Sequence, residues 1–254
     1  MSTETMLTVE SLRKSTDDGI IFSELTLSIP KKGIHGLLAP NGAGKTALLN
    51  ILAGWDDDFE GEILLGEASL GRDALTRKKR IGFLPAVPAL DPSMTVEEIT
   101  VFAGRAKQVP AEKLDARVKE ALDLVGLSHV SRRLCGNLTP FERRKLSVAI
   151  ALVGNPRLIL LDEPTRNLGR AEAREMWELI RVLGEVKTVL VATDRYEEAA
   201  ELCEDVILMA DGRILASGTL AELEEQLVRK QGAGGMNLSA VYASLSGVRK
   251  EGRK

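Results

Sequence analysis

A lysine that follows closely spaced glycines can surround a phosphate group, and one such run lies between residues 41 and 47. Small residues let successive backbone N–H groups turn toward phosphate oxygens, and the positive end of a following helix strengthens the attraction. The Lys45 ammonium would contact the outer phosphates of a nucleotide, and the Thr46 hydroxyl would bind Mg²⁺. The predicted nucleotide-binding residues are Asn41, Gly42, Ala43, Gly44, Lys45, Thr46 and Ala47.

Two adjacent carboxylates, Asp162 and Glu163, form the second candidate site. They follow four apolar residues, 158–161, which are typical of a buried strand. In a parallel sheet the carboxyl end of such a strand emerges beside the phosphate loop, where ligands bind. We therefore predict that Asp162 holds Mg²⁺, directly or through water, and that Glu163 is the catalytic residue that polarises an attacking water.

The elements that must position these residues alternate between strands and helices, which is typical of a doubly wound sheet. The first 30 residues alternate in hydrophobicity like antiparallel strands. The predicted later strands cover residues 34–38, 62–65, 81–84, 158–161 and 188–192, and the helices cover 46–53, 95–107, 110–126, 140–153, 170–183, 196–203 and 219–230. We predict an α/β fold with a mostly parallel sheet, an N-terminal antiparallel β subdomain and a helical subdomain inserted at about 89–150.

The bulk composition limits the partners. A net charge of −3 gives no reason to expect nucleic acid, which usually requires a basic surface. Basic clusters at 77–80, 143–145 and 249–254 are predicted to be solvated faces or a frayed terminus. Cys135 and Cys203 suit no metal spacing and fit a reduced, cytosolic location. No apolar run reaches the roughly 18 residues of a membrane helix, so another polypeptide would supply any membrane part.

Together the phosphate loop, the helical insert and the segment 161–165 (Leu-Asp-Glu-Pro-Thr) resemble the ABC ATPase family over nearly the whole chain. The stretches 36–54, 211–223 and 237–247 look most like bacterial exporters of the ABC-2 type. The resemblance implies that ATP and Mg²⁺ are bound and that two such domains enclose two ATP molecules. It also implies transmembrane subunits on the helical insert and a location on the inner face of the cell membrane. We expect an ATP-binding domain at 1–230, and a flexible joint and tail at 231–254.

Several positions depart from the family pattern. The signature Leu-Ser-Gly-Gly-Gln is replaced by residues 138–142 (Leu-Thr-Pro-Phe-Glu), in which Thr139 and Glu142 predict a capping box. A helix start that satisfies its own N–H groups is a poor phosphate clamp, and Pro140 removes one donor. Other departures are Ala39 for the first glycine of the loop, Ala86 for a glutamine, Gly169 for an aspartate, Asp194 for a histidine and Thr16 for the adenine-stacking aromatic residue. His35 and His129 are predicted to be structural.

Three functions fit these observations. The first is a transporter ATPase subunit with weak hydrolysis of its own, paired with a different and more regular ATP-binding subunit rather than with a copy of itself. The second is a nucleotide-binding pseudo-ATPase that clamps a heteromeric complex. The third, a non-transport ABC protein acting on DNA or ribosomes, is disfavoured because the chain has neither a second ATPase unit nor a long coiled coil. Retention of Glu163 favours some hydrolysis.

Overall fold

The computed structural model describes residues 4–17, 19–71 and 73–231, with side chains as far as residue 225. The tail predicted at 231–254 lies outside the described residues except for its first residue. The strands are β1 (Thr5–Thr16), β2 (Gly19–Pro30), β3 (Gly33–Leu38), β4 (Glu60–Leu65), β5 (Ala68–Ser69), β6 (Ile81–Leu84), β7 (Leu158–Asp162), β8 (Thr188–Thr193), β9 (Asp205–Ala210) and β10 (Arg213–Gly218). The helices are α1 (Lys45–Leu52), α2 (Ala74–Arg80), α3 (Val96–Ala106), α4 (Ala111–Leu124), α5 (Pro140–Leu152), α6 (Arg170–Val186), α7 (Tyr196–Leu202) and α8 (Leu220–Gln231), with the 3-10 turns η1 (Ser128–Val130) and η2 (Cys135–Asn137).

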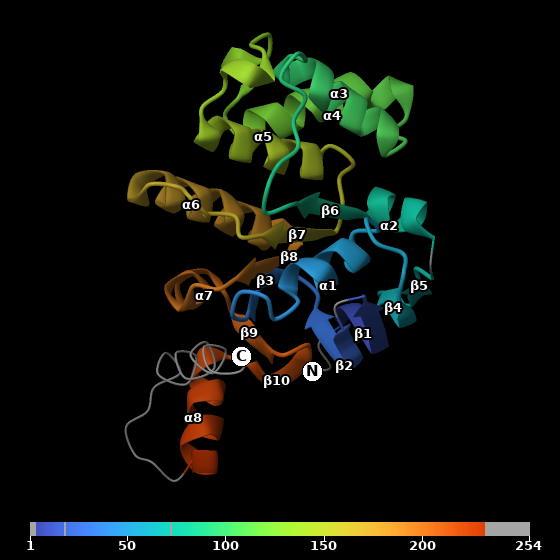
Figure 1. Cartoon of the computed structure of the whole chain (residues 1–254). Coiled ribbons are helices and arrows are strands. Elements are labelled where there is room, and N and C mark those ends of the chain that lie inside the picture. Colours follow the sequence, from blue (N-terminus) through green and yellow to red (C-terminus); the bar gives the residue numbers. More distant parts are fainter. Residues whose placement is uncertain (1–3, 18, 72, 232–254) are drawn as a thin grey trace.

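Two sheets organise the chain. The first has six strands in the order β10-β9-β3-β8-β7-β6, and only the pairing of β10 with β9 is antiparallel. The second is antiparallel, in the order β2-β1-β4-β5. Figure 1 shows α3, α4 and α5 gathered beyond the β6 edge of the large sheet, far from the antiparallel sheet. The predicted fold class, including the helical insertion, is confirmed.

Burial on both faces explains the apolar runs of the central strands. Every residue of β3, β7 and β8 is buried. Leu158 and Leu160 point into a core shared with α1 and the antiparallel sheet, whereas Ile159 and Leu161 point into the core shared with α6 and the helical insertion. This two-sided packing holds β7 rigidly, and with it the carboxylates at its carboxyl end. Among the described residues, no helix is both long and apolar enough to cross a membrane.

The sequence did not predict α2, and the prediction that residues 77–80 form a solvated cluster is wrong for Arg77. Its side chain is fully buried, where it pairs with Asp57, donates to the Gly71 carbonyl at 2.5 Å and lies 5.3 Å above the Phe59 ring. Both terminal nitrogens of the buried guanidinium thus have partners, which offsets much of the cost of burying the charge, whereas Nε has no hydrogen-bond partner among the described residues. Arg77 therefore ties α2 to the loop that follows α1.

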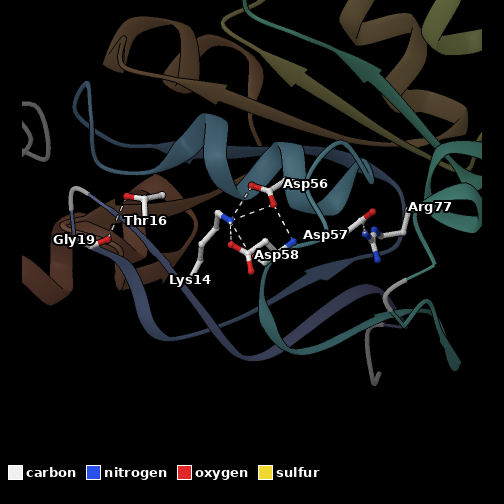
Figure 2. Close-up of polar contacts among 7 residues, drawn as sticks. All are labelled: Lys14, Thr16, Gly19, Asp56, Asp57, Asp58 and Arg77. Carbon is white, nitrogen blue, oxygen red and sulfur yellow. Dashed lines mark hydrogen bonds and ion pairs between the residues drawn. The ribbon is translucent and has the colours of Figure 1, made fainter.

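An acidic run, residues 56–58, connects that loop to the antiparallel sheet as well (Figure 2). Lys14 of β1 donates to Asp56 at 3.1 Å and to the Asp58 carbonyl at 2.6 Å, and its side chain is only 7% exposed. The three aspartates thus hold one cation from β1 and one from α2. These contacts fix the antiparallel sheet against the helix that begins in the phosphate loop.

Candidate nucleotide-binding site

Sheet register brings the two candidate motifs together. Leu38 of β3 pairs with Thr193 of β8, and Asp162 of β7 pairs with Ala192 of β8. Because these strands are parallel and end at the same edge, the loop after β3 and the carboxylates after β7 emerge side by side. The predicted meeting of residues 41–47 with Asp162 and Glu163 is what the structure shows.

The glycines give the loop its shape. Gly42 and Gly44 have φ values of 78° and 106°, which residues with side chains rarely adopt. A Cβ atom on Gly44 would also lie 2.8 Å from Phe22 of β2, so the site tolerates no side chain there. The turn leads directly into α1, whose first backbone N–H groups have no helical partner. This local geometry provides the backbone donors that a phosphate group requires.

Lys45 lies within this loop rather than on the surface. Its side chain is 6% exposed, and the ammonium donates to the Ala39 carbonyl at 2.7 Å. It lies 3.3 Å from Glu163 Oε1, a contact that is an ion pair without the alignment of a hydrogen bond. The ammonium is therefore held where the loop closes, in contact with the Glu163 carboxylate.

Thr46 and Asp162 form an oxygen pair that fits a hard divalent cation. The Thr46 hydroxyl donates to Asp162 Oδ2 at 2.7 Å. Asp162 Oδ1 is buried and has no hydrogen-bond partner among the described residues. Burial raises the pKa of Asp162 above its ordinary value, which marks an incompletely stabilised charge. A hydroxyl and a carboxylate with a free oxygen are ligands that Mg²⁺ prefers, so these residues fit the predicted metal.

Glu163 has the environment of a base. Its backbone has a φ of 49°, an uncommon conformation that is fixed by the hydrogen bond from its N–H to the Ala192 carbonyl at 2.9 Å. Burial is the main cause that raises the pKa of Glu163, and the Lys45 ammonium acts against this shift. A carboxylate whose pKa is raised accepts a proton more readily, as a group that polarises water must.

A buried carboxylate that the sequence did not single out lies behind this site. Glu198 of α7 is fully buried and accepts hydrogen bonds from the Thr165 hydroxyl at 2.5 Å, the Thr193 hydroxyl at 2.6 Å and Trp177 Nε1 at 3.1 Å. It therefore joins the segment after Glu163 to the end of β8. In the sequence Glu198 is one of several acidic residues at the start of α7, and no pattern there indicated that it would be buried.

Comparison with known proteins identifies the family of this site. The family model for ABC transporters matches residues 22–166, which is more than half of the chain. The chain is an ABC transporter ATP-binding protein. It is 34% identical over 222 residues to the uncharacterized ABC transporter ATP-binding protein YxlF of Bacillus subtilis, a match covering 87% of this chain and 73% of that protein.

Relatives named for export are about as similar to this ABC ATPase as the Bacillus subtilis protein is. The Nod factor export ATP-binding protein I of Burkholderia lata is 34% identical, over 82% of this chain and 69% of its own length. The daunorubicin resistance ATP-binding protein DrrA3 of Streptomyces coeruleorubidus is 32% identical, over 88% of this chain and 71% of its own length. A solved ATP-binding subunit of an ABC transporter superposes with a TM-score of 0.80 at 21% identity, covering 95% of this chain and 99% of that one, which supports the fold alone.

At the family's signature position, the predicted capping box of this ABC ATPase is present. The Thr139 hydroxyl accepts from Glu142 N at 3.1 Å, and Glu142 Oε2 accepts from Thr139 N at 2.8 Å. Glu142 also pairs with Arg133 at 3.0 Å. The hydrogen bond from the Thr139 backbone is the main cause that lowers the pKa of the Glu142 carboxyl, and Arg133 adds to this effect. The Phe141 ring packs against the Lys145 ammonium, with 5.1 Å between Lys145 Nζ and the centre of the ring. The capping box thus satisfies two backbone donors at the start of α5, the N–H groups of Thr139 and Glu142.

The segment that carries Ala86 is held by an arginine. Arg144 donates to the carbonyls of Pro85 at 3.2 Å and Ala86 at 3.0 Å, and to that of Arg166 at 3.4 Å. Its side chain is buried, so the prediction that residues 143–145 form a solvated cluster is wrong for Arg144. In the sequence Arg144 is one of three consecutive basic residues, and no pattern there indicated which of them would be buried.

Two other substituted positions, Gly169 and Asp194, have hydrogen-bond partners within the chain. Gly169 precedes α6 and donates its N–H to Glu172 at 3.0 Å. Asp194 accepts a hydrogen bond from Asn41 Nδ2 at 2.7 Å. His35 is buried in β3, with Nε2 donating to the Lys32 carbonyl at 2.9 Å, whereas His129 is exposed on η1. Neither histidine joins the carboxylates of the site.

Proposed function

We propose that this ABC ATPase binds Mg-ATP at residues 41–47 and couples the closing of an ATPase pair to the transmembrane subunits of an exporter. The observation that carries the proposal is the pairing of Thr46 with Asp162, whose second oxygen is buried without a partner. Export-named relatives over more than 80% of the chain support the direction of transport. In this role the subunit lies on the cytoplasmic face of the membrane, without spanning it.

Each residue of the site has a distinct task in this proposal. The backbone N–H groups of residues 41–47 orient the triphosphate, and the Lys45 ammonium attracts its outer oxygens. Thr46 and Asp162 hold Mg²⁺, which supplies neutralisation of charge on the phosphates. Glu163 orients a water and accepts its proton. The proposed domain boundaries are 1–230 for the ATP-binding domain, with the helical subdomain at about 89–150.

Weak intrinsic hydrolysis and a different partner subunit follow from the start of α5. In the family, two ATPase domains face each other and each completes the phosphate site of the other. A second copy of this chain would present a helix start in which the N–H groups of Thr139 and Glu142 are already bonded within the capping box, and its first residue is a proline without an N–H. A more regular ATP-binding subunit would supply free donors instead. We therefore favour a heterodimer.

The same capping box favours a second candidate, a pseudo-ATPase in which bound ATP only clamps a complex. Turnover distinguishes the two candidates. Retention of Glu163 next to Lys45, with its pKa raised, supports residual hydrolysis, because a clamp needs no water-polarising carboxylate.

Two measurements test the proposal. In a fluorescent-ATP titration, Lys45→Ala should weaken binding by about 100-fold or more, because it removes the buried ammonium from the loop; unchanged affinity would remove the loop from the proposal. The purified chain should hydrolyse ATP very slowly, and the rate should rise when it is assembled with its native subunits. Brisk turnover by the isolated chain that Glu163→Gln abolishes would contradict the predicted weak activity. No turnover in the native complex would favour the clamp.

A further inference from the structure

The hairpin that joins β9 to β10 lies against the phosphate loop. β9 pairs with β3, the strand that leads into the loop, as far as Leu38, and it continues beyond this pair to Ala210. The turn that follows Ala210 therefore projects from the same edge of the sheet as the loop. At this turn the Gly212 N–H donates to the Ala43 carbonyl, inside the loop, at 3.2 Å.

The turn lies between the loop and β2. Asp211 and Gly212 have φ values of 47° and 71°, and positive values at both positions are typical of a tight two-residue hairpin turn. A Cβ atom on Gly212 would overlap the Ile21 carbonyl of β2, so the two backbones are in direct contact. Figure 1 shows β10 beside β2. Contact with β2 therefore supports the turn and fixes the position of the Gly212 N–H.

The bond from Gly212 orients one peptide unit of the loop. The Ala43 carbonyl and the Gly44 N–H belong to the same planar trans peptide, so they point in opposite directions. Because the carbonyl points at the hairpin, the Gly44 N–H points away from it. That N–H has no hydrogen-bond acceptor among the described residues. One donor of the phosphate loop is thus available to a ligand and is oriented from outside the loop.

Side chains from the strands that hold the hairpin also pack against Gly44. A Cβ atom built on Gly44 would lie 2.8 Å from Phe22 of β2 and 3.1 Å from Met209 of β9, and both side chains are buried. The peptide between Ala43 and Gly44 is therefore confined by the Gly212 bond and by this packing. It cannot rotate unless β2 or the hairpin moves, so the direction of the Gly44 N–H depends on where the hairpin lies.

We propose that Gly212 is a positioning residue for nucleotide binding, which acts through the Ala43 carbonyl to aim the Gly44 N–H at a phosphate oxygen. This inference rests on the proposed function, since it requires the loop to bind the phosphates of a nucleotide. It adds that the hairpin belongs to the binding machinery without touching the nucleotide. The coupling is reciprocal, so a nucleotide that uses the Gly44 N–H also stabilises the bond between Gly212 and Ala43.

Gly212→Ala tests the inference in the full chain, because the added methyl group meets the Ile21 carbonyl and displaces the turn. Displacement of a fluorescent nucleotide by Mg-ADP should show an affinity about tenfold lower than that of the wild type, the scale of one hydrogen bond to a charged group. In ¹⁵N-labelled protein, Mg-ADP should shift the Gly44 amide resonance of the wild type strongly and that of the variant much less.

Gly66→Ala is the matched control. Gly66 lies in the turn between β4 and β5 with a φ of 63°, and a Cβ atom there would meet nothing within 4 Å. The control therefore introduces a similar backbone strain away from the phosphate loop. It should bind Mg-ADP with the affinity of the wild type and show the same shift of the Gly44 resonance.

Amide hydrogen exchange provides a second measurement that needs no variant. In the wild type, exchange at Gly212 should slow about tenfold when Mg-ADP is bound, because binding and the bond to Ala43 stabilise each other. The Gly66 N–H, which donates to the Met6 carbonyl at 2.8 Å, is the internal reference and should slow less.

The outcomes separate this inference from the proposed function. Wild-type affinity for Mg-ADP in a folded Gly212→Ala variant, or an undiminished shift of its Gly44 resonance, would overturn the inference and leave the proposed function intact. An equal loss of affinity in Gly66→Ala would also overturn it, because strain in any turn would then be the cause. If Gly212→Ala does not fold, equal slowing of exchange at Gly212 and Gly66 overturns the inference. Failure of the wild type to bind Mg-ADP would refute the proposed function itself.

Discussion

Replacing Asp162 by asparagine should make the chain more stable when nucleotide and Mg²⁺ are absent. The wild-type side chain is fully buried, yet only one of its oxygens accepts a hydrogen bond, from Thr46 at 2.7 Å. An asparagine of the same shape keeps an acceptor for Thr46 and removes the buried charge. Residues arranged to bind a cation are commonly strained without it, so the gain in stability should accompany a loss of function.

The magnitude follows from opposing contributions. A buried acceptor without a partner costs about 1–3 kcal/mol, and more when it is charged. Against this, the variant loses the attraction of the Asp162 charge to the Lys45 ammonium, and it buries an amide group where the unpartnered oxygen lies. We expect the free energy of unfolding to rise by about 1–2 kcal/mol at pH 7.

The pH dependence of this gain in stability tests whether the buried charge of Asp162 is its cause. Because burial raises the pKa of Asp162 in the folded state above its ordinary value of 3.8, the folded state holds the proton to higher pH than the unfolded state. The contribution of Asp162 to stability therefore falls as pH rises from about that value through the raised pKa. The advantage of Asp162→Asn should accordingly be small near pH 3 and complete at pH 7.

Urea denaturation in EDTA, followed by tryptophan fluorescence, measures this difference. Asp115→Asn on the exposed surface of α4 is the control and should change stability by less than about 0.5 kcal/mol. Adding Mg-ATP should stabilise the wild type more than the variant, since only the wild type retains the metal ligand. An Asp162→Asn variant that is less stable than the wild type at pH 7 would refute the reasoning.

Two further predictions concern stability. Glu198→Ala leaves two buried hydroxyls and the Trp177 indole without an acceptor, and should lower the free energy of unfolding by about 3 kcal/mol or more. The neighbouring Glu197→Ala should have an effect below about 0.5 kcal/mol in the same urea titration, and equal losses would contradict the network. Thr139→Ala should cost about 1 kcal/mol and Thr139→Ser only a few tenths, whereas a neutral alanine variant in thermal unfolding would mean that the capping box contributes nothing.

Local chemistry explains what the sequence determined by itself. The phosphate loop was predictable because its glycines and Lys45 must lie close together in the chain for the loop to form. The capping box at Thr139 was predictable for a similar reason, since both hydrogen bonds join residues three apart. The alternation of strands and helices predicted the sheet, and therefore the edge at which Asp162 meets the loop.

Contacts between residues far apart in the chain were decided only by the tertiary structure. Arg77 and Arg144 belong to basic clusters that are typical of solvated surfaces, yet each is buried against carbonyls or a carboxylate from other elements. The bond from Asn41 to Asp194 spans 153 positions, and it joins the phosphate loop to the residue that follows β8. Whether a charged side chain is solvated or buried depends on which donors and acceptors the packed elements leave unpaired, and composition and spacing do not contain that information.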